Sequence, residues 1–305
     1  MVDLKGLKFS KMHGIGNDFP IINEFDGEVI PEEDKPEACR ILCHRNFGVG
    51  GDGVLFVEPS KVADIGYRMF NPDGSEAEMC GNGIRCFGDF VYRKGILKQE
   101  KMTVETRAGI KTIEITLEDD EPVLFKVDMG LSTFKTPEIP MICDKEEFLD
   151  GELEVIDTTF NVTAISVGNP HAIIFVDNVD DVDINKYGPA IEAHEVFPEK
   201  INVHFVEVIS KNEGRMITWE RGAGITLACG TGATSTAISG YKLGLFDENI
   251  LLHLPGGDLK FQVYEKENAA GYRSIRSGYG LHGFFPRIRK DPGRKIQYRG
   301  DTECL

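Results

Sequence analysis

The chain has 305 residues, enough for one large domain or two domains of ordinary size. Its formal net charge is −16, which argues against nucleic acid as a partner, because binding phosphates requires a basic face. The same charge argues against attraction to an anionic lipid surface. We interpret the excess of acidic residues as a contribution to solubility.

The sequence shows no pattern of a targeted or membrane-spanning chain. Residues 1–14 lack an apolar core of signal-peptide length, and no run of about 18 apolar residues occurs in the chain. Seven cysteines are an odd number, and they are spread along the whole sequence, which is typical of reduced thiols rather than of a disulfide framework. We therefore expect a cytoplasmic protein without a membrane partner.

In the first half, the residue pattern predicts short strands and one helix. The helix follows Cys80, where the apolar residues change to helical spacing, and Gly95 is placed to end it. Its apolar stripe consists of Ile84, Phe87 and Val91. Runs rich in β-branched and apolar residues predict strands at Val54–Val57, Thr103–Thr106 and Ile110–Leu117.

In the second half, a similar series of elements follows the acidic stretch Glu118–Pro122, which we interpret as a linker. A second helix is expected after Cys229, with Gly244 at its end. Its apolar stripe consists of Ala233, Ala237, Ile238 and Tyr241. Strands are predicted at Phe125–Met129, Ala172–Val176, Val203–Ile209, Ile250–Leu254 and Asp258–Tyr264.

The two halves are an internal repeat. Each contains Cys-Gly-x-Gly, at 80–83 and at 229–232, and each cysteine is followed at equal spacing by a tyrosine and a glycine. Gly-Asn precedes each cysteine by a similar distance, and two β-like runs around a glycine follow each helix. The other landmarks are Tyr92 and Tyr241, Gly95 and Gly244, Gly16-Asn17 and Gly168-Asn169, and Gly109 and Gly257.

Cys80 and Cys229 are the candidate catalytic residues. Each precedes a helix whose first amides and dipole favour an anion, and such a position is expected to lower the pKa of a thiol. If the halves pack about a pseudo-twofold axis, the two thiols face one cleft. One could then remove a proton from a carbon while the other delivers a proton to the opposite face. This arrangement would invert a stereocentre, and the helix N-termini would hold the carboxylate that accepts carbanion charge.

Other roles for these cysteines have weaker support. Neither cysteine belongs to a Cys-x-x-Cys redox pair, and no histidine is marked by its context as the base of a nucleophilic thiol. A zinc site built on Cys39, Cys43 and His44 would lack a second ligand pair. We interpret these two cysteines, together with Cys86 and Cys143, as buried structural residues, and Cys304 as a thiol without a role.

Other motifs are also read as structural. Gly48–Gly53 matches G-x-G-x-x-G but leads into a strand and not a helix, so a tight turn is the better interpretation. A calcium loop at Asp181–Glu192 would need glycine where Lys186 stands. Neither a metal site nor a cofactor site is predicted.

Six further motifs are Lys11–Phe19, Phe70–Ser75, Met79–Cys86, Gly168–His171, Trp219–Gly224 and Ala228–Ala233. At these motifs the sequence resembles diaminopimelate epimerase, and the resemblance covers residues 8–260. The resemblance implies an α+β fold of two similar, pseudo-twofold-related halves, each a curved mixed sheet or barrel around a central helix. It also implies an enzyme that interconverts LL- and meso-diaminopimelate in lysine biosynthesis without pyridoxal phosphate or a metal.

The resemblance also assigns site residues. Cys80 and Cys229 would be the two bases, and the reacting α-carboxylate and amine would be held by Asn17, Gly81, Asn82, Gly230 and Thr231. The distal end of the amino-acid substrate would be held by Asn71, Asn169, Asn202, Glu220 and Arg221. An arginine fork for a carboxylate and a glutamate for an ammonium suit a second zwitterion. The alternative interpretation of Glu220 and Arg221 is a surface ion pair. Some members of the family are homodimers.

Three departures from the family pattern bear on substrate and domain organisation. Ile225 stands where glutamate is usual, Gly53 replaces a glutamine of some members, and the usual Gly-Pro-Ala strand is lacking after about residue 265. We expect an N-terminal half at 1–122 and a C-terminal half at 123–269, with residues from about 270 to 305 returning to the first half. The alternatives are a racemase of another amino acid, such as histidine or proline, with the same cysteine pair; an isomerase that uses a different acid–base pair; and a non-catalytic binding protein.

Overall fold

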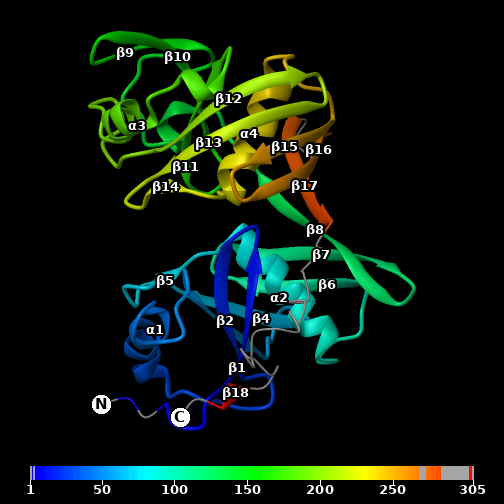
Figure 1. Cartoon of the computed structure of the whole chain (residues 1–305). Helices are drawn as coiled ribbons and strands as arrows, with labels where there is room; N and C mark the ends of the chain where they lie inside the picture. Colours follow the sequence, from blue (N-terminus) through cyan, green and yellow to red (C-terminus); the bar gives the residue numbers. More distant parts are fainter. Residues whose placement is uncertain (1, 3, 268–272, 283–301, 304–305) are drawn as a thin grey trace, which may run out of the picture. The chain divides into compact units, whose positions relative to one another are not determined.

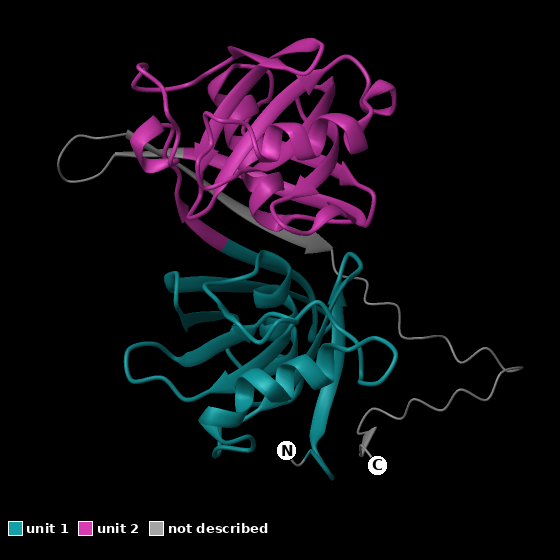
Figure 2. Cartoon of the chain, turned by 90° about the vertical axis from the view of Figure 1, so that its left-hand side faces the viewer, with its two compact units in different colours: residues 1–127, 282–305 teal, residues 128–281 magenta. Residues whose placement is uncertain are grey.

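The computed structural model describes residues 2, 4–267, 273–282 and 302–303. These residues form two compact units (Figures 1 and 2). Unit 1 comprises Met1–Val127 with His282–Leu305, and unit 2 comprises Asp128–Leu281.

Unit 1 is a mixed sheet curled around one helix. Its central helix α2 (Gly81–Arg93) contacts β1, β2, β3 and β4, and Figure 1 shows it enclosed by the strands. A second helix, α1 (Lys35–Cys43), follows the single turn η1 (Glu32–Asp34). The strands are β1 (Lys8–Gly14), β2 (Asn17–Asn23), β3 (Val54–Glu58), β4 (Ile65–Phe70), β5 (Glu76–Ala77), β6 (Lys101–Thr106), β7 (Gly109–Glu118) and β8 (Glu121–Leu131).

Unit 2 has the same design. Its central helix α4 (Gly230–Lys242) contacts β10, β11, β12, β15 and β16. The other helical segments are η2 (Thr136–Glu138), η3 (Val179–Asp181) and α3 (Ile184–Glu192). The strands are β9 (Gly151–Val155), β10 (Thr158–Ser166), β11 (Pro170–Val176), β12 (Asn202–Ser210), β13 (Glu213–Glu220), β14 (Gly224–Thr226), β15 (Asn249–Leu254), β16 (Gly257–Glu267) and β17 (Arg273–His282).

The pairing of the strands repeats step by step. The antiparallel pair β1–β2, the parallel pair β2–β3 and the antiparallel pair β3–β4 of unit 1 correspond to the pairs β10–β11, β11–β12 and β12–β13 of unit 2. A parallel pair then follows, β4–β6 or β13–β15, and after it the antiparallel runs β6–β7–β8 and β15–β16–β17. The predicted α+β fold of two pseudo-symmetric halves is thus confirmed.

Small residues let each sheet pack closely on its helix. An added Cβ at Gly88 of α2 would lie 3.1 Å from the Ile113 side chain of β7, and one at Gly232 of α4 would lie 2.1 Å from the His204 side chain of β12. Both helices end at the predicted glycines, because Gly95 and Gly244 have φ of 73° and 69°, which glycine adopts without strain.

The predicted strands are all present, but the predicted linker is wrong. Residues 118–121 form the turn of the β7–β8 hairpin, with Asp119 and Asp120 at φ of 51° and 63°. Asp is among the residues that tolerate this left-handed conformation, so an acidic stretch can make a turn as readily as a linker. The chain passes from unit 1 to unit 2 within β8, between Val127 and Asp128 (Figure 2).

The C-terminal segment divides between the units. Residues Arg273–Gly280 of β17 pair with β16 in unit 2, and not with unit 1 as a boundary near 270 implied. β18 (Thr302–Glu303) pairs with Lys8 and Phe9 of β1 in unit 1. Cys304 and most of the other residues from 270 to 305 that were expected to return to the first half lie outside the described residues.

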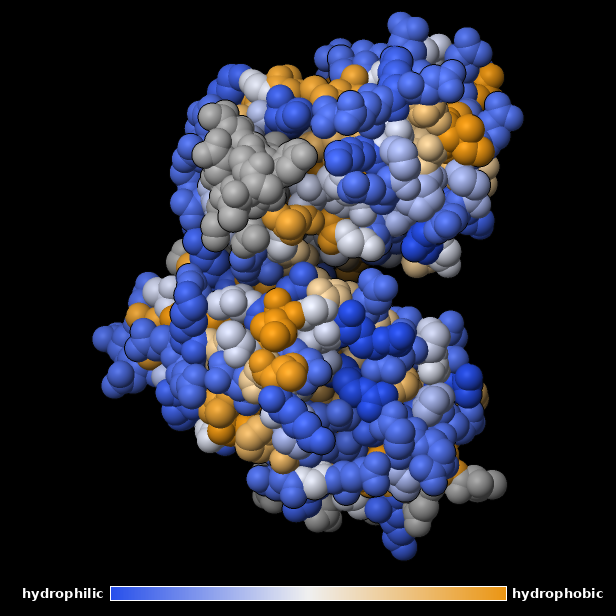
Figure 3. Space-filling model, turned by 180° about the vertical axis from the view of Figure 1, so that it is seen from behind, coloured by the Kyte–Doolittle hydropathy of each residue, from blue (hydrophilic) through white to orange (hydrophobic). Residues whose placement is uncertain are grey.

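The face of the protein that is seen in Figure 3 is mostly hydrophilic, and the hydrophobic residues on it form separate patches. In the described part of the chain, no helix is both long enough and apolar enough to cross a membrane.

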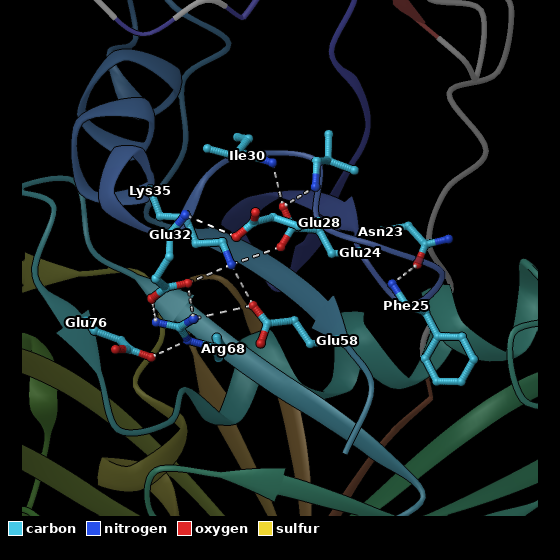
Figure 4. A network of polar contacts seen from close by, with 11 residues as sticks. Asn23, Glu24, Phe25, Glu28, Ile30, Glu32, Lys35, Glu58, Arg68 and Glu76 are labelled. Carbon is cyan, nitrogen blue, oxygen red and sulfur yellow. Dashed lines mark hydrogen bonds and ion pairs between the residues drawn. The ribbon is translucent and has the colours of Figure 1, made fainter. Parts of the chain in front are cut away.

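A buried ion network fixes α1 to the sheet of unit 1 (Figure 4). Lys35, whose side chain is 3% exposed, lies 2.9 Å from each of three carboxylates, those of Glu24, Glu32 and Glu58. Burial lowers the pKa of Lys35, but the hydrogen bonds to these carboxylates outweigh it and raise the pKa above its ordinary value. Arg68 continues the network to Glu32, Glu58 and Glu76.

We predict that Lys35→Met destabilises the protein by about 3–5 kcal/mol, because it leaves the Glu24 carboxylate, also 3% exposed, buried without its cation. Urea unfolding measures this change. The control Lys242→Met removes a half-exposed pair with Glu147 at 3.7 Å and should cost less than about 1 kcal/mol. Equal effects of the two variants would contradict the assigned role of the network.

Candidate active site

Cys80 caps the N-terminus of α2 with its side chain. It has φ −124° and ψ 125°, and its Sγ accepts a hydrogen bond from the amide of Gly83 at 3.4 Å. This glycine is required by packing, since an added Cβ would lie 2.8 Å from the hydroxyl of Tyr67. The predicted residues Gly81 and Asn82 form the first turn, where amides have no acceptor within the helix and point toward the cap.

The β1–β2 hairpin brings Asn17 to this helix start. Its two-residue turn has positive φ at both Ile15 and Gly16, as a type I′ turn requires. Asn17 Oδ1 accepts from Cys80 Sγ at 3.5 Å and from the side-chain amide of Asn82 at 3.4 Å. Three predicted site residues of unit 1 therefore lie together.

A cluster of charged residues surrounds the other end of Asn17. Its Nδ2 donates to Oδ2 of Asp52 at 2.6 Å, and Arg45 bridges Asp52 and Asp18 at 2.6 and 3.0 Å. Burial raises the pKa of Asp18, but hydrogen bonds from Arg45 and Lys11 outweigh it and hold the pKa below its ordinary value. Asp52 is not among the site residues predicted from the sequence.

Cys229 caps α4 in the same way. It has φ −125° and ψ 106°, and its Sγ accepts from the amide of Gly232 at 3.4 Å. The Thr231 hydroxyl lies 3.6 Å from the sulfur. Gly232 also lies over a buried ring, because an added Cβ would be 2.1 Å from Cε1 of His204. The predicted first turn, Gly230 and Thr231, thus lies at the thiol.

The expected lowering of the thiol pKa is wrong for Cys229. Burial raises its pKa well above the ordinary value, and the nearby carboxylate of Glu220 raises it further. Hydrogen bonds from the Thr231 hydroxyl and the Gly232 amide lower the pKa, but by less than burial and Glu220 raise it. A helix N-terminus alone therefore does not produce a thiolate here, and Cys229 is a thiol at neutral pH. The effect of Glu220 on this pKa also places its carboxylate close to Cys229.

A chain of hydrogen bonds holds Asn169 beside the same helix start. Asn169 lies 2.9 Å from Nε2 of His171, whose Nδ1 lies 2.9 Å from Nε2 of His204. The Asn169 amide donates to the Thr231 hydroxyl at 3.4 Å. Both histidines are fully buried, and burial lowers the pKa of each, that of His204 to about 3, so both are neutral. The chain ends at Thr218 Oγ1, 3.0 Å from His204 Nδ1.

The remaining predicted residues have contacts outside these two clusters. Asn202 is buried, donates to the carbonyl of Pro170 at 2.8 Å and accepts from the amide of Arg221 at 3.0 Å. Its side chain therefore fixes the turn that presents Arg221, whose exposed guanidinium donates to the carbonyl of Glu199 at 3.0 Å. Asn71 is half-buried in a turn and donates to the Ser75 hydroxyl at 3.0 Å.

The departures from the family pattern are accommodated locally. A side chain longer than glycine does not fit at position 53, because an added Cβ would lie 2.8 Å from Met69 and 2.9 Å from the carbonyl of Phe70. Ile225 lies on β14 opposite Trp219 and is 52% exposed. The glutamine and glutamate of the family pattern are thus replaced at one packed and one exposed position.

Three polar residues at the two sites were missed: Asp52, His171 and His204. His171 lies within the quoted Gly168–His171 motif, but no role was read from it. His204 was detectable as a polar residue inside the apolar strand β12, where burial requires a partner. Asp52 stands between two glycines, and only the folded loop shows its contact with Asn17.

A sequence profile described as "Diaminopimelate epimerase" matches residues 9–135 and 163–276. The chain belongs to this family. A diaminopimelate epimerase of Methanothermobacter thermautotrophicus is 57% identical over 285 residues, covering 93% of this chain and 99% of its own. The diaminopimelate epimerase of Methanocaldococcus jannaschii is 48% identical, covering 84% and 92%, and that of Desulforapulum autotrophicum is 44% identical, covering 93% and 99%.

Solved structures support the fold. A phenazine biosynthesis protein of the PhzF family from Bacillus anthracis aligns with a TM-score of 0.64 and 18% identity, covering 90% of this chain and 94% of its own. A hydroxyproline epimerase from Agrobacterium vitis with bound trans-4-hydroxy-L-proline aligns with a TM-score of 0.63 and 14% identity, covering 90% and 87%. At this identity the likeness concerns the fold alone.

We predict that Glu220→Gln lowers the pKa of Cys229, because the neutral amide no longer opposes the negative charge of the thiolate. The rate of Cys229 alkylation at a fixed pH below the pKa should rise about tenfold for each unit of that shift. Mass spectrometry of the peptide that carries Cys229 measures the rate. The control Glu213→Gln, which alters a pair with His253, should leave the rate unchanged; a similar rise there would contradict the assignment.

Proposed function

We propose that the chain interconverts LL- and meso-diaminopimelate by inverting Cα, with Cys80 and Cys229 as the two proton-transfer groups. The observation that carries this proposal is the repeated geometry: each half holds one cysteine as the cap of its central helix, with Sγ 3.4 Å from a first-turn amide. Family membership and relatives at 44–57% identity support the substrate.

The mechanism requires one thiolate and one thiol at opposite faces of the same carbon. The thiolate takes the α-proton as the opposed thiol donates its own, and the roles exchange in the reverse direction. First-turn amides of α2 and α4 would hold the α-carboxylate, which accepts charge as the proton leaves. Both thiols must be reduced, and the six described cysteines are all free thiols.

The raised pKa of Cys229 suits this chemistry. An α-proton of an amino acid is a very weak acid, so a base of high pKa has more driving force to remove it than an ordinary thiolate. The adjacent carboxylate of Glu220 is placed to take the proton of the thiol and so form that base. This transfer moves one negative charge from the carboxylate to the sulfur and creates no new charge in the site.

The distal end of the substrate distinguishes this proposal from its nearest rival. Diaminopimelate carries a second ammonium and carboxylate, and the exposed Arg221 can form a bidentate pair with a carboxylate. A racemase of proline or histidine would have no distal carboxylate for this fork. We further propose that the reaction uses no cofactor and takes place in the cytoplasm, where cysteines stay reduced, and that the enzyme can form a homodimer.

The proposal is tested by incubating reduced protein with LL-diaminopimelate in D₂O and following Cα by proton NMR. We expect loss of the Cα signal together with formation of the meso isomer, without added cofactor. Exchange with proline or histidine but not with diaminopimelate would replace the substrate assignment. No exchange with any amino acid, in folded protein with free thiols, would overturn the reaction.

We predict that Arg221→Met lowers kcat/KM for diaminopimelate roughly a hundredfold or more, because it removes the partner of the distal carboxylate. The control Arg215→Met removes a surface arginine paired with Glu207 at 3.6 Å and should leave kcat/KM near that of the wild type. A small effect of the Arg221 substitution would favour a substrate without a distal carboxylate.

A further inference from the structure

The two cysteines share a cap geometry, but the asparagines beside them are held in opposite directions. Asn17 and Asn169 occupy equivalent places, each after the glycine in a hairpin turn, that of β1–β2 in unit 1 and that of β10–β11 in unit 2. Asn17 turns its carbonyl oxygen toward the helix start and its NH₂ group away from it. Asn169 turns its NH₂ group toward Thr231 at the other helix start, while its oxygen lies at His171.

The partner of Asn17 determines its direction. A carboxylate only accepts hydrogen bonds, so Oδ2 of Asp52, at 2.6 Å, can be faced by the NH₂ group of Asn17 and not by its oxygen. Asp52 is held in turn, because its Oδ2 accepts from the amide of Asp18 at 3.1 Å and its Oδ1 from Arg45 at 2.6 Å. The orientation of the amide thus follows from chemistry and not from a choice between similar atoms.

We propose that Asp52 is a positioning residue that fixes the side-chain amide of Asn17 so that its carbonyl oxygen faces the sulfur of Cys80. This inference rests on the proposed function only in making Cys80 a proton-transfer group. A carbonyl oxygen accepts from S–H and repels a thiolate, so Asp52 keeps Cys80 protonated through Asn17. A reversed amide would donate N–H to the sulfur and stabilise the thiolate.

On this assignment, the two halves keep their cysteines protonated in different ways. At Cys229 the thiol form is favoured by burial and by the carboxylate of Glu220 in direct contact. Cys80 is more exposed than Cys229. The carboxylate of Asp52 favours its thiol form indirectly, by holding the side-chain amide of Asn17 that contacts the sulfur. Both cysteines of the free protein then rest as thiols, ready to donate. Other polar and charged groups around the Asn17–Cys80 contact are Lys11, Asp18, Arg45, Tyr67, Asn82 and Arg85.

The test is the pH dependence of Cys80 alkylation by iodoacetamide in the full chain, followed by mass spectrometry of the peptide that carries Cys80. Asp52→Asn allows the Asn17 amide to turn, so the midpoint should move to lower pH and the rate at pH 7 should rise roughly tenfold. An unchanged profile would overturn the proposal.

Removal of a negative charge could also move the midpoint, so two controls separate charge from orientation. Asp18→Asn removes a charge from the same cluster but leaves the Asn17–Asp52 bond, and it should shift the profile little. In an Asn17→Leu background, Asp52→Asn should have no further effect, because no amide remains to be turned. An equal shift in Asp18→Asn, or a full shift in the double variant, would overturn the proposal.

If Asp52→Asn does not fold, an NMR measurement on the wild-type protein tests the proposal. Selective ¹⁵N labelling of asparagine makes the Asn17 NH₂ group observable, and its protons should shift as the Asp52 carboxyl is titrated with acid. NH₂ protons of Asn17 that do not follow that titration would overturn the proposal. None of these readouts requires turnover, so they remain valid if the protein acts on another amino acid, and failure of the epimerase assay leaves them unaffected.

Discussion

The hydrogen bond from a first-turn amide to a cysteine sulfur is the interaction on which the rest of each half depends. In both halves the third residue of the helix donates this hydrogen bond, and it is a glycine whose surroundings leave no room for a Cβ. In each half a hairpin of the sheet, β1–β2 or β10–β11, brings an asparagine to the helix start. The same arrangement of helix, cap cysteine and asparagine thus occurs in both halves.

The repetition extends to the backbone but not to the polar side chains around each sulfur. Unit 1 holds its asparagine with an ion cluster at the surface, whereas unit 2 uses two buried neutral histidines and places a glutamate at the thiol. An epimerase must bind two stereoisomers that differ only at Cα. Equivalent backbone scaffolds with different polar partners would suit the two-cysteine reaction that we propose, in which each thiol acts on a different face of the carbon.

Most of the fold could be predicted from the sequence, because hydrophobic spacing and the repeat of Cys-Gly-x-Gly reflect local backbone geometry. The helix ends at Gly95 and Gly244 and the strand pairs around Gly109 and Gly257 follow from such local patterns. The prediction of a linker at Glu118–Pro122 was wrong because Asp119 and Asp120 suit a left-handed turn as well as an exposed connection. The high pKa of Cys229 follows mainly from its burial in the fold, and the hydrogen bond between Asn17 and Asp52 joins residues 35 positions apart, so no local pattern contains either.

The most direct test of the two-cysteine account is deuterium incorporation and stereoinversion by Cys80→Ser and Cys229→Ser, each measured from LL- and from meso-diaminopimelate in D₂O. The account predicts that each single variant loses epimerisation by on the order of a thousandfold or more, because serine is too weak an acid and base at neutral pH to replace either thiol. Cys143→Ser, at a half-buried cysteine outside both helix caps, should retain activity. Epimerisation near the wild-type rate by either cap variant would contradict the account.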